Sequence, residues 1–110
     1  MAKSIQRQLK DDEFVNRIYD EFNCIVLREF MFHESRKWRI DFFIPEHKIG
    51  IEVEGAVWTR GRHTRGSGFV KDIEKYNEIT AYGIRLLRTT PDKMLSTQFF
   101  DVISRCIKSD

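Results

Sequence analysis

The sequence has few cysteines and no long run of apolar residues, and these two shortages exclude several classes of protein. Two cysteines in 110 residues cannot form the framework of a disulfide-rich scaffold. Cys24 and Cys106 are far apart and lack metal-ligand spacing, so we expect two buried, free thiols. No segment approaches the ~20 apolar residues that cross a bilayer, so we expect no membrane partner. The first residues also lack the apolar core of a signal peptide, which predicts a cytoplasmic protein of a bacterium or an infected host.

The length and the charge of the chain indicate a small globular protein with a local basic segment. A chain of 110 residues has room for one hydrophobic core, so we expect a single domain over residues 1–110. Hydrophobic residues make up 41% and charged residues 33%, which is typical of a folded chain. The net charge of +2 alone predicts no nucleic-acid partner. The segment 60–71, however, has no acid and contains four cations and a histidine: Arg60, Arg62, His63, Arg65 and Lys71. Such a segment is typical of a phosphate-binding surface.

The spacing of apolar residues predicts a mixed sheet flanked by helices. Apolar residues four positions apart indicate a first helix over residues 11–22, with Asp11 and Asp12 at its start. Runs of β-branched and aromatic residues indicate three strands, followed by a helix, a short strand and a final helix. The predicted strands span residues 25–32, 38–44, 48–54 and 84–88. The second helix spans residues 69–82, and the last helix starts at Thr90, with Thr90 as its cap and Pro91 at the first helical position. The order α-β-β-β-α-β-α defines an α/β fold.

Several details of these elements follow from the same patterns. Pro45–Lys48 predicts a hairpin turn, and the glycines at positions 61, 66 and 68 predict a loop. The strand 84–88 has apolar side chains on both faces, which favours an interior position in the sheet. The expected apolar stripes of the last two helices are Phe69, Ile73, Tyr76 and Thr80, and then Leu95, Phe99, Val102, Cys106 and Ile107.

Three carboxylates are predicted to meet on one face of the hairpin. If the turn is centred between residues 46 and 47, Asp41 and Glu52 are equally far from it and lie opposite each other. Glu54 points to the same face because it is two positions on from Glu52. Like charges so placed destabilise a sheet unless a hard cation such as Mg²⁺ binds them. The alternative is a solvated strand face with ordinary ion pairs, using Arg36 or Arg39 for Asp41 and Lys48 for Glu52.

Four segments together resemble a known superfamily of nucleases. They are RKWRIDFFIPEHKIGIEVEG (Arg36–Gly55), Arg62-His63, DIEKYN (Asp72–Asn77) and GIRLLR (Gly83–Arg88). This pattern resembles the PD-(D/E)xK superfamily, and most of all its small branch of very-short-patch repair endonucleases and related phage and bacterial nucleases. The resemblance covers roughly Glu29 to Thr90. It implies an αβββαβ restriction-endonuclease-like core with a C-terminal helix added, and Mg²⁺-dependent cleavage of DNA, with Mn²⁺ as a substitute.

The resemblance also implies roles for individual residues. Asp41 corresponds to the metal-binding aspartate, Glu52 to the second acid, and the carbonyl of Val53 to a further metal ligand. Glu54 occupies the position where the superfamily has its lysine, and we consider Lys75 a relocated lysine, with a solvated helix face as the alternative. An additional acid often assists the metal in this superfamily, and the sequence leaves three candidates open: Glu13, Glu21 and Glu29.

The basic glycine-containing loop completes the predicted site. Arg60, Arg62, Arg65 and Lys71 are candidates for binding DNA phosphates, because arginine pairs with phosphate bidentately. His63 could contact phosphate or act as an acid or base near the leaving oxygen. The alternative for the whole segment is a solvated loop without a ligand.

The sequence therefore predicts a metal-dependent DNA endonuclease, either a nicking or a structure-directed enzyme. Cutting two strands symmetrically, as a junction resolvase does, would suit a homodimer. The alternative is a catalytically inactive nuclease fold that only binds DNA, and the acid at Glu54 favours it. The pair Asp41 and Glu52 argues against that alternative, because clustered acids repel phosphate.

Overall fold

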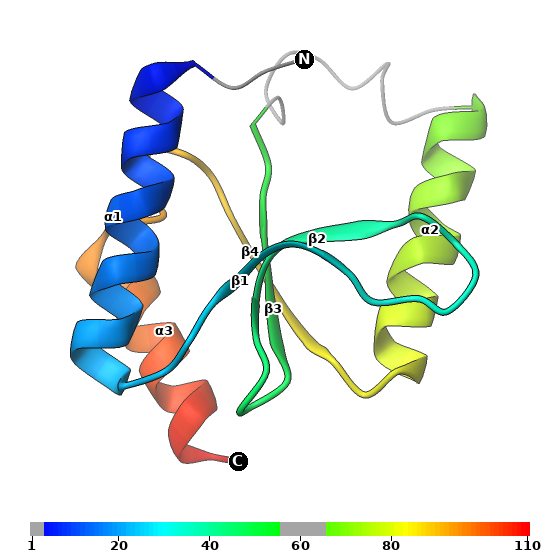
Figure 1. The fold of residues 1–110 in the computed structure, drawn as a ribbon. Coiled ribbons are helices and arrows are strands. Elements are labelled where there is room, and N and C mark those ends of the chain that lie inside the picture. Colours follow the sequence, from blue (N-terminus) through cyan, green and yellow to red (C-terminus); the bar gives the residue numbers. More distant parts are fainter. Residues whose placement is uncertain (1–3, 56–65) are drawn as a thin grey trace.

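A computed structural model describes residues 4–55 and 66–110, and only the backbone of residues 66–71. Within these ranges it contains three helices and four strands in the predicted order. They are α1 (Ile5–Phe22), β1 (Leu27–Met31), β2 (Arg39–Ile44), β3 (Ile49–Val53), α2 (Gly66–Ala81), β4 (Arg85–Thr89) and α3 (Thr97–Lys108) (Figure 1). The α/β class and the C-terminal helix are thereby confirmed.

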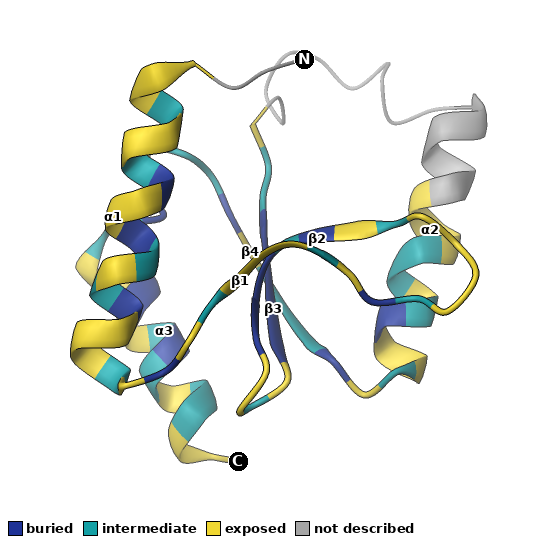
Figure 2. Ribbon diagram, in the orientation of Figure 1, coloured by how far each residue is buried: buried dark blue, intermediate teal, exposed yellow. Residues whose placement is uncertain are grey.

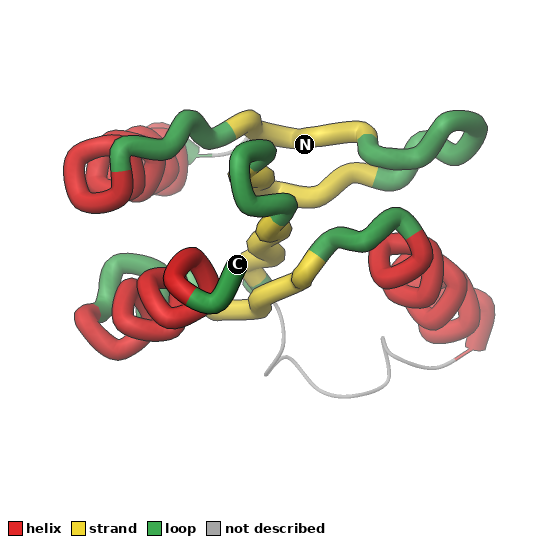
Figure 3. Tube along the Cα trace, turned by 90° about the horizontal axis from the view of Figure 1, so that it is seen from below, coloured by secondary structure: helices red, strands yellow, loops and turns green. Residues whose placement is uncertain are grey.

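The described strands form one mixed sheet in the order β1-β2-β3-β4. β1 and β3 both run antiparallel to β2, while β4 runs parallel to β3. In Figures 1 and 3, α1 and α3 lie on one side of this sheet and α2 lies on the other. The result is three layers, helix–sheet–helix, with both faces of the sheet covered.

The β2–β3 hairpin has the register that the sequence predicts. Phe43 lies opposite Gly50 and Ile44 lies opposite Ile49, on either side of a turn at residues 45–48. The same register, continued past Phe42 and Ile51 by one residue, sets Asp41 opposite Glu52. The turn closes with hydrogen bonds to the carbonyls of Ile44 and Pro45, and Lys48 adopts a left-handed backbone conformation.

Two clusters of buried apolar side chains hold the layers together (Figure 2). The first joins the sheet to α1 and α3, and includes Phe14, Ile18, Phe42, Ile44, Ile49, Ile51, Phe99, Phe100 and Ile103. The second joins the sheet to α2, and consists of Phe32, Ile40, Phe43, Ile79 and Ile84. Ile40 and Phe42 therefore belong to opposite clusters, although residues two apart in a regular strand share a face. The alternation along β2 is interrupted beside Asp41.

The predicted start of the first helix is wrong. α1 begins at Ile5, and its cap is Ser4, whose Oγ accepts a hydrogen bond from the Arg7 amide at 3.1 Å. The apolar pattern missed the first turns because their apolar side chains face solvent: Ile5 and Leu9 are 74% and 62% exposed. Their sequence, IQRQLK, still consists largely of good helix formers.

The predicted start of the last helix is also wrong. Thr90 closes a turn by accepting from the Met94 amide, but the helix itself begins at Thr97, with Ser96 as its cap. The Ser96 Oγ accepts from the Phe99 amide at 3.1 Å, whereas the Thr90 hydroxyl donates to Asp92. The predicted stripe is right in large part, because Phe99 is buried and Leu95, Cys106 and Ile107 pack against the same cluster. It missed Phe100 and Ile103, which are buried as well.

The interior position predicted for the last strand is a further error. β4 is an edge strand, and β3 is its neighbour. Its apolar side chains face both ways because helices cover both faces of the sheet: Leu86 packs with the α2 cluster and Leu87 with the α1–α3 cluster. Apolar residues on both faces of a strand indicate that both faces of the sheet are covered. They do not indicate whether the strand lies at the edge of the sheet or in its interior.

Helix α2 differs from the prediction at its start and in its buried face. It begins at Gly66, so two glycines assigned to the loop, Gly66 and Gly68, lie in its first turn. Of the predicted stripe, Tyr76 packs against the second cluster, but Ile73 is 46% exposed and Ile79 is buried instead, so the buried face is rotated in part from the predicted stripe. This rotation turns the side of the helix that carries Lys75 and Tyr76 toward β3 and β4.

Candidate active site

Asp41 joins β2 to β3 where the ladder of strand pairs ends. Its Oδ2 accepts a hydrogen bond from the backbone amide of Val53 at 2.8 Å. The last recorded pair of the hairpin is Phe42 with Ile51, so this side-chain bond replaces the next backbone contact. Asp41 is half-buried. The bond fixes one carboxylate oxygen against β3, next to the position of Glu52.

Glu52 lies on β3 and forms an ion pair with Lys75 of α2. Lys75 Nζ is 3.1 Å from Glu52 Oε2, and the two side chains are 17% and 11% exposed. The sequence offered Arg36 or Arg39 as a partner for Asp41 and Lys48 for Glu52. Arg36 instead pairs with Glu74 at 3.6 Å, and Lys48 donates to the carbonyl of Tyr82. Among the described residues, no ion pair joins Arg39 to Asp41. The carboxylate of Glu52 is therefore held between the sheet and α2 rather than on a solvated strand face.

Glu54 has its own cation, Arg88 of β4. Arg88 Nε is 2.8 Å from Glu54 Oε2, and its guanidinium carbon lies 4.7 Å from the centre of the Tyr76 ring. Parallel pairing of β3 with β4 also sets Arg88 opposite Glu52. Tyr76 and Arg88 are members of this site that the sequence prediction missed. Both occur in the segments DIEKYN and GIRLLR, so the signal was present, but their placement required the register of β3 with β4.

Burial and neighbouring charges raise the pKa values of two side chains in this cluster, Glu52 and Tyr76. Burial raises the pKa of Glu52 above its ordinary value, and the nearby carboxylate of Asp41 raises it further, while Lys75 opposes both effects. Burial, together with Glu52 and Glu54, raises the pKa of Tyr76 to about 12. Tyr76 therefore stays a neutral phenol at physiological pH, and the ionised form of Glu52 is costly in the folded chain.

The donor set fits a hard divalent cation. Among the described residues, Lys75 and Arg88 pair with Glu52 and Glu54, and Asp41 adds a third carboxylate, so these five side chains carry a net charge of −1. Within the described part of the chain, the hydrogen bond of Asp41 uses Oδ2 and the ion pair of Glu52 uses Oε2. Each acid thus keeps a second oxygen for a ligand. Mg²⁺ typically binds one or two carboxylates and completes its shell with water and phosphate oxygens.

The candidates for an additional acid have different surroundings. Glu21 forms an ion pair with Arg17, at 3.1 Å, and Glu13 is exposed on α1. Glu29 lies opposite Asp41 in the β1–β2 register, between the pairs made by Arg28 and Phe30, and has a left-handed backbone with φ of 50°. Of the three, Glu29 is the one that shares a row of the sheet with Asp41 and Glu52.

Asp11 is a further acid that sequence reasoning placed only at a helix end. It is 2% exposed in the middle of α1, pairs with Arg7 at 3.2 Å, and helps to line a hollow of about 210 Å³ that Glu29 also lines. The signal for its burial was the helical spacing of Asp11, Phe14 and Ile18, which puts the acid on the apolar stripe.

The predicted DNA-binding side chains all lie outside the described part of the structure: Arg60, Arg62, His63, Arg65 and Lys71. Their roles stay predictions from the sequence. None of the helices in the described ranges is both long and apolar enough to cross a membrane.

Comparison with known proteins supports the fold. No family model and no curated protein matches the sequence. Among solved structures, the chain is similar to the catalytic domain of the homing endonuclease I-Bth0305I, with 23% sequence identity over 88% of each chain and a TM-score of 0.50. At this identity the similarity establishes a common architecture, that of a nuclease-like core, and leaves the chemistry to be argued from the side chains.

Proposed function

We propose that this protein is a metal-dependent DNA endonuclease of the PD-(D/E)xK type, related to the branch that contains the very-short-patch repair endonucleases. The proposal depends on one observation above all, the contact between Lys75 and Glu52. Nucleases of this type combine two acids with a lysine. Here the strand position of the lysine holds Glu54, and α2 brings a lysine to the second acid. The resemblance of the fold to a homing endonuclease catalytic domain supports the same reading.

The energetic cost of the cluster also favours a ligand. Burying a carboxylate is unfavourable unless it is paired and hydrogen-bonded, and a second carboxylate opposite it adds repulsion. Glu52 is 9% exposed and lies beside Asp41. Without a ligand, an apolar residue at one of these positions would therefore make the folded chain more stable. A protein that only binds DNA would gain nothing from these acids, because they repel phosphate. Phosphodiester hydrolysis supplies a reason to keep them.

Each residue of the cluster has a distinct proposed role. Asp41 and Glu52 hold Mg²⁺, with the carbonyl of Val53 as a third protein ligand. When bound, Mg²⁺ stabilises the negative charge that develops on the phosphoryl group and lowers the pKa of a bound water. Lys75 pairs with the carboxylate of Glu52 and, from there, would orient an attacking water. Arg88 neutralises Glu54, which keeps a third negative charge from repelling the DNA.

We propose DNA as the substrate, cleaved by nicking or in a structure-directed way. Arg60, Arg62, Arg65 and Lys71 would bind backbone phosphates near the acids, because the segment that carries them follows β3 directly. His63 would assist at the leaving oxygen or contact phosphate. A homodimer would allow both strands of a branched substrate to be cut.

The test is cleavage of a supercoiled plasmid and a synthetic four-way junction by the purified full chain in Mg²⁺, Mn²⁺ and EDTA. We expect cutting that requires metal, is lost in Asp41→Asn, and is retained in Asp101→Asn, a matched change in the exposed Arg105 pair on α3. A preference for the junction would identify a structure-directed enzyme, and relaxed circles would identify a nickase. Binding without cutting in any metal would refute the proposal in favour of an inactive DNA-binding protein.

A further inference from the structure

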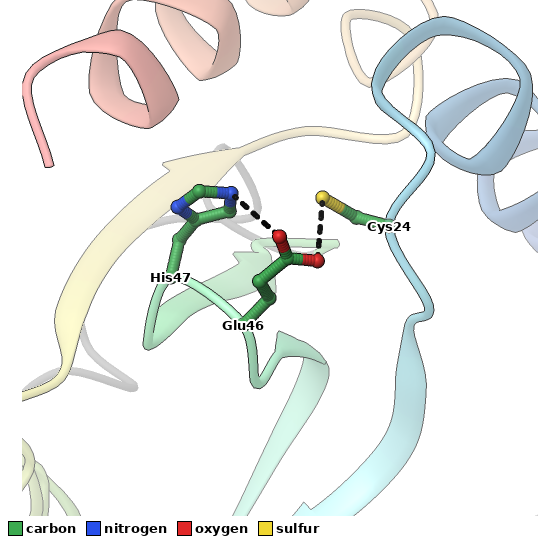
Figure 4. Close-up of side chains that lie close together, drawn as sticks. All are labelled: Cys24, Glu46 and His47. Carbon is green, nitrogen blue, oxygen red and sulfur yellow. Dashed lines mark hydrogen bonds and ion pairs between the residues drawn. The ribbon is translucent and has the colours of Figure 1, made fainter.

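A second group of potential metal ligands lies at the other end of the hairpin. Cys24, Glu46 and His47 each present a ligand atom, and these atoms all lie within 4.8 Å of one another (Figure 4). Cys24 Sγ is 3.8 Å from Glu46 Oε1, and His47 Nε2 is 3.9 Å from Glu46 Oε2. The carboxylate thus lies between the thiol and the imidazole. None of the three belongs to the proposed nuclease site.

Three parts of the fold bring this group together. Cys24 lies in the connection between α1 and β1, directly after Asn23, whose left-handed backbone ends the helix. Glu46 and His47 form the middle of the β2–β3 turn. The Cys24 side chain is buried, whereas Glu46 is exposed, so an ion could enter from the solvent side of the carboxylate.

The imidazole of His47 is already oriented toward the group. Its Nδ1 is 2.6 Å from Asp110 Oδ2, beyond the end of α3, and its side chain is 17% exposed. A carboxylate on one ring nitrogen fixes the tautomer and leaves the other nitrogen as an acceptor, the arrangement that is usual for metal-bound histidines. Here the free nitrogen is Nε2, which faces Glu46 in Figure 4. Arg85 lies 3.5 Å from the other oxygen of Asp110 and helps to hold it in place.

The donor set and the spacing both point to zinc. A thiolate and an imidazole favour a borderline-soft ion over Mg²⁺, and Zn²⁺ commonly accepts a carboxylate as well. Bond lengths of ~2.0–2.3 Å at tetrahedral angles put neighbouring ligand atoms roughly 3.3–3.6 Å apart. The observed distances to the two oxygens of Glu46, 3.8 and 3.9 Å, exceed this by a few tenths of an ångström. The ligand atoms of all three residues lie within 4.8 Å of one another, so rotation of the exposed Glu46 and of His47 must bring them closer together. We propose that Cys24, Glu46 and His47 bind one Zn²⁺ ion, with Asp110 orienting His47 and water filling the fourth position.

Zinc binding here involves one proton transfer. Burial and the adjacent Glu46 raise the pKa of the Cys24 thiol, so the metal-free protein holds a neutral thiol hydrogen-bonded to Glu46 and to the carbonyl of Phe22. When the sulfur–zinc bond forms, the thiol releases its proton to solvent, and no electron is transferred. The positive ion then balances both the thiolate and Glu46.

This site is separate from the acidic cluster and does not depend on the proposed function. His47 and Glu52 are five positions apart along one side of the hairpin, which corresponds to roughly 16 Å at ~3.3 Å per residue. A bound zinc would join the α1–β1 connection, the hairpin turn and the end of α3, the three segments that converge here. We therefore expect a stabilising ion rather than one that takes part in hydrolysis.

The test is titration of the metal-free full chain with Co²⁺, which replaces zinc and reports a sulfur ligand by a charge-transfer absorption band. We expect one equivalent to bind with tetrahedral visible bands, and Zn²⁺ to displace it. Cys24→Ser should abolish the sulfur band, while Cys106→Ser, a matched change in the other free cysteine, should leave it unchanged. Asp110→Asn should weaken binding about 10–100-fold, as expected for the partner of a metal-bound histidine.

Two further measurements keep the proposal falsifiable if Cys24→Ser folds poorly. His47→Gln changes a more accessible residue, and it should remove the tetrahedral visible bands. Zn²⁺ should raise the melting temperature of the wild type and of Asp41→Asn equally, but not that of His47→Gln. A wild-type chain without a sulfur–cobalt band, or a band that persists in Cys24→Ser, would overturn the proposal even if DNA cleavage is established.

Discussion

Lys75 Nζ of α2 lies 3.1 Å from Glu52 Oε2 of β3, and this contact spans 23 residues of sequence. The cation beside Glu52 thus comes from a helix, whereas the nearby strand residue Glu54 is an acid. Glu54 in turn pairs with Arg88, which lies opposite Glu52 on β4. Lys75 reaches Glu52 because α2 packs beside β3 and β4 on this face of the sheet.

Removing the charge of Lys75 should stop cleavage without preventing folding. Lys75→Gln keeps a hydrogen-bond donor for Glu52 but no cation, so we expect cleavage to fall about 10²–10⁴-fold, the range for loss of a group that handles the attacking water. Single-turnover plasmid cleavage measures this effect, with Lys108→Gln on the exposed end of α3 as the matched control. Equal rates for Lys75→Gln and the wild type would remove Lys75 from the reaction and favour an ordinary ion pair.

Asp41→Asn should stabilise the metal-free protein while abolishing its response to Mg²⁺. The asparagine carbonyl can still accept from the Val53 amide, and the repulsion with Glu52 disappears. Like charges across a strand pair cost about 0.2–1 kcal/mol, so the free energy of unfolding in EDTA should rise by that amount. Urea denaturation with and without Mg²⁺ measures both effects. A wild-type chain that Mg²⁺ does not stabilise would count against the metal site.

The raised pKa of Glu52 predicts how stability changes with pH. Burial penalises the ionised form of Glu52 in the folded chain and not in the unfolded chain. As the pH falls through the raised pKa, the folded protein takes up a proton that the unfolded chain does not, and stability increases. The gain ends near the ordinary value of 4.5, where the unfolded chain is protonated as well. The wild type should therefore gain stability relative to Glu52→Gln on acidification in EDTA. A constant difference between their unfolding free energies would contradict this.

The order of elements and the hairpin register could be read from the sequence because both depend on local patterns. Alternating apolar residues on either side of the turn at 45–48 fix which residues face each other, and Asp41 and Glu52 come directly after the last pair, Phe42 with Ile51. Lys75 could be named as a candidate because it lies in a motif that the resemblance covers.

Features that depend on packing between distant elements could not be predicted. The side of α2 that turns toward the sheet is set by Ile79 and its neighbours in the second cluster, and a helical pattern alone gave a different face. Arg88 reaches Glu54 through the parallel register of β3 and β4, which no local turn determines. The group of Cys24, Glu46 and His47 combines residues whose spacing in sequence resembles no metal motif. The start of α1 was missed because Ser4 caps turns whose apolar side chains face solvent. The start of α3 was missed because Thr90 begins a separate turn ahead of the helix that Ser96 caps.

Gly50 is predicted to be essential for close packing of β3 against the α2 side of the core. A Cβ added there would lie 3.2 Å from a methyl carbon of Ile40 and 3.2 Å from one of Ile84. Gly50→Ala should therefore lower the free energy of unfolding by about 1–3 kcal/mol, the usual cost of overpacking. Gly55→Ala is the matched control, because a Cβ there meets no described atom within 4 Å and should change stability by less than about 0.5 kcal/mol. Urea denaturation compares the two, and equal losses would contradict close packing at Gly50.

Arg62→Ala should weaken DNA binding through loss of a phosphate contact. Each neutralised phosphate releases about one counterion, so the slope of the logarithm of affinity against that of salt concentration should fall by about one. Binding is measured in EDTA, so that no DNA is cut, on a linear duplex and on the four-way junction over a range of salt concentrations. The matched control is Arg105→Ala, which removes an exposed arginine that pairs with Asp101 on α3 and should leave the slope unchanged. If both variants have the wild-type slope, the segment after β3 does not contact the DNA backbone. A fall on the junction alone would instead assign Arg62 to recognition of DNA structure.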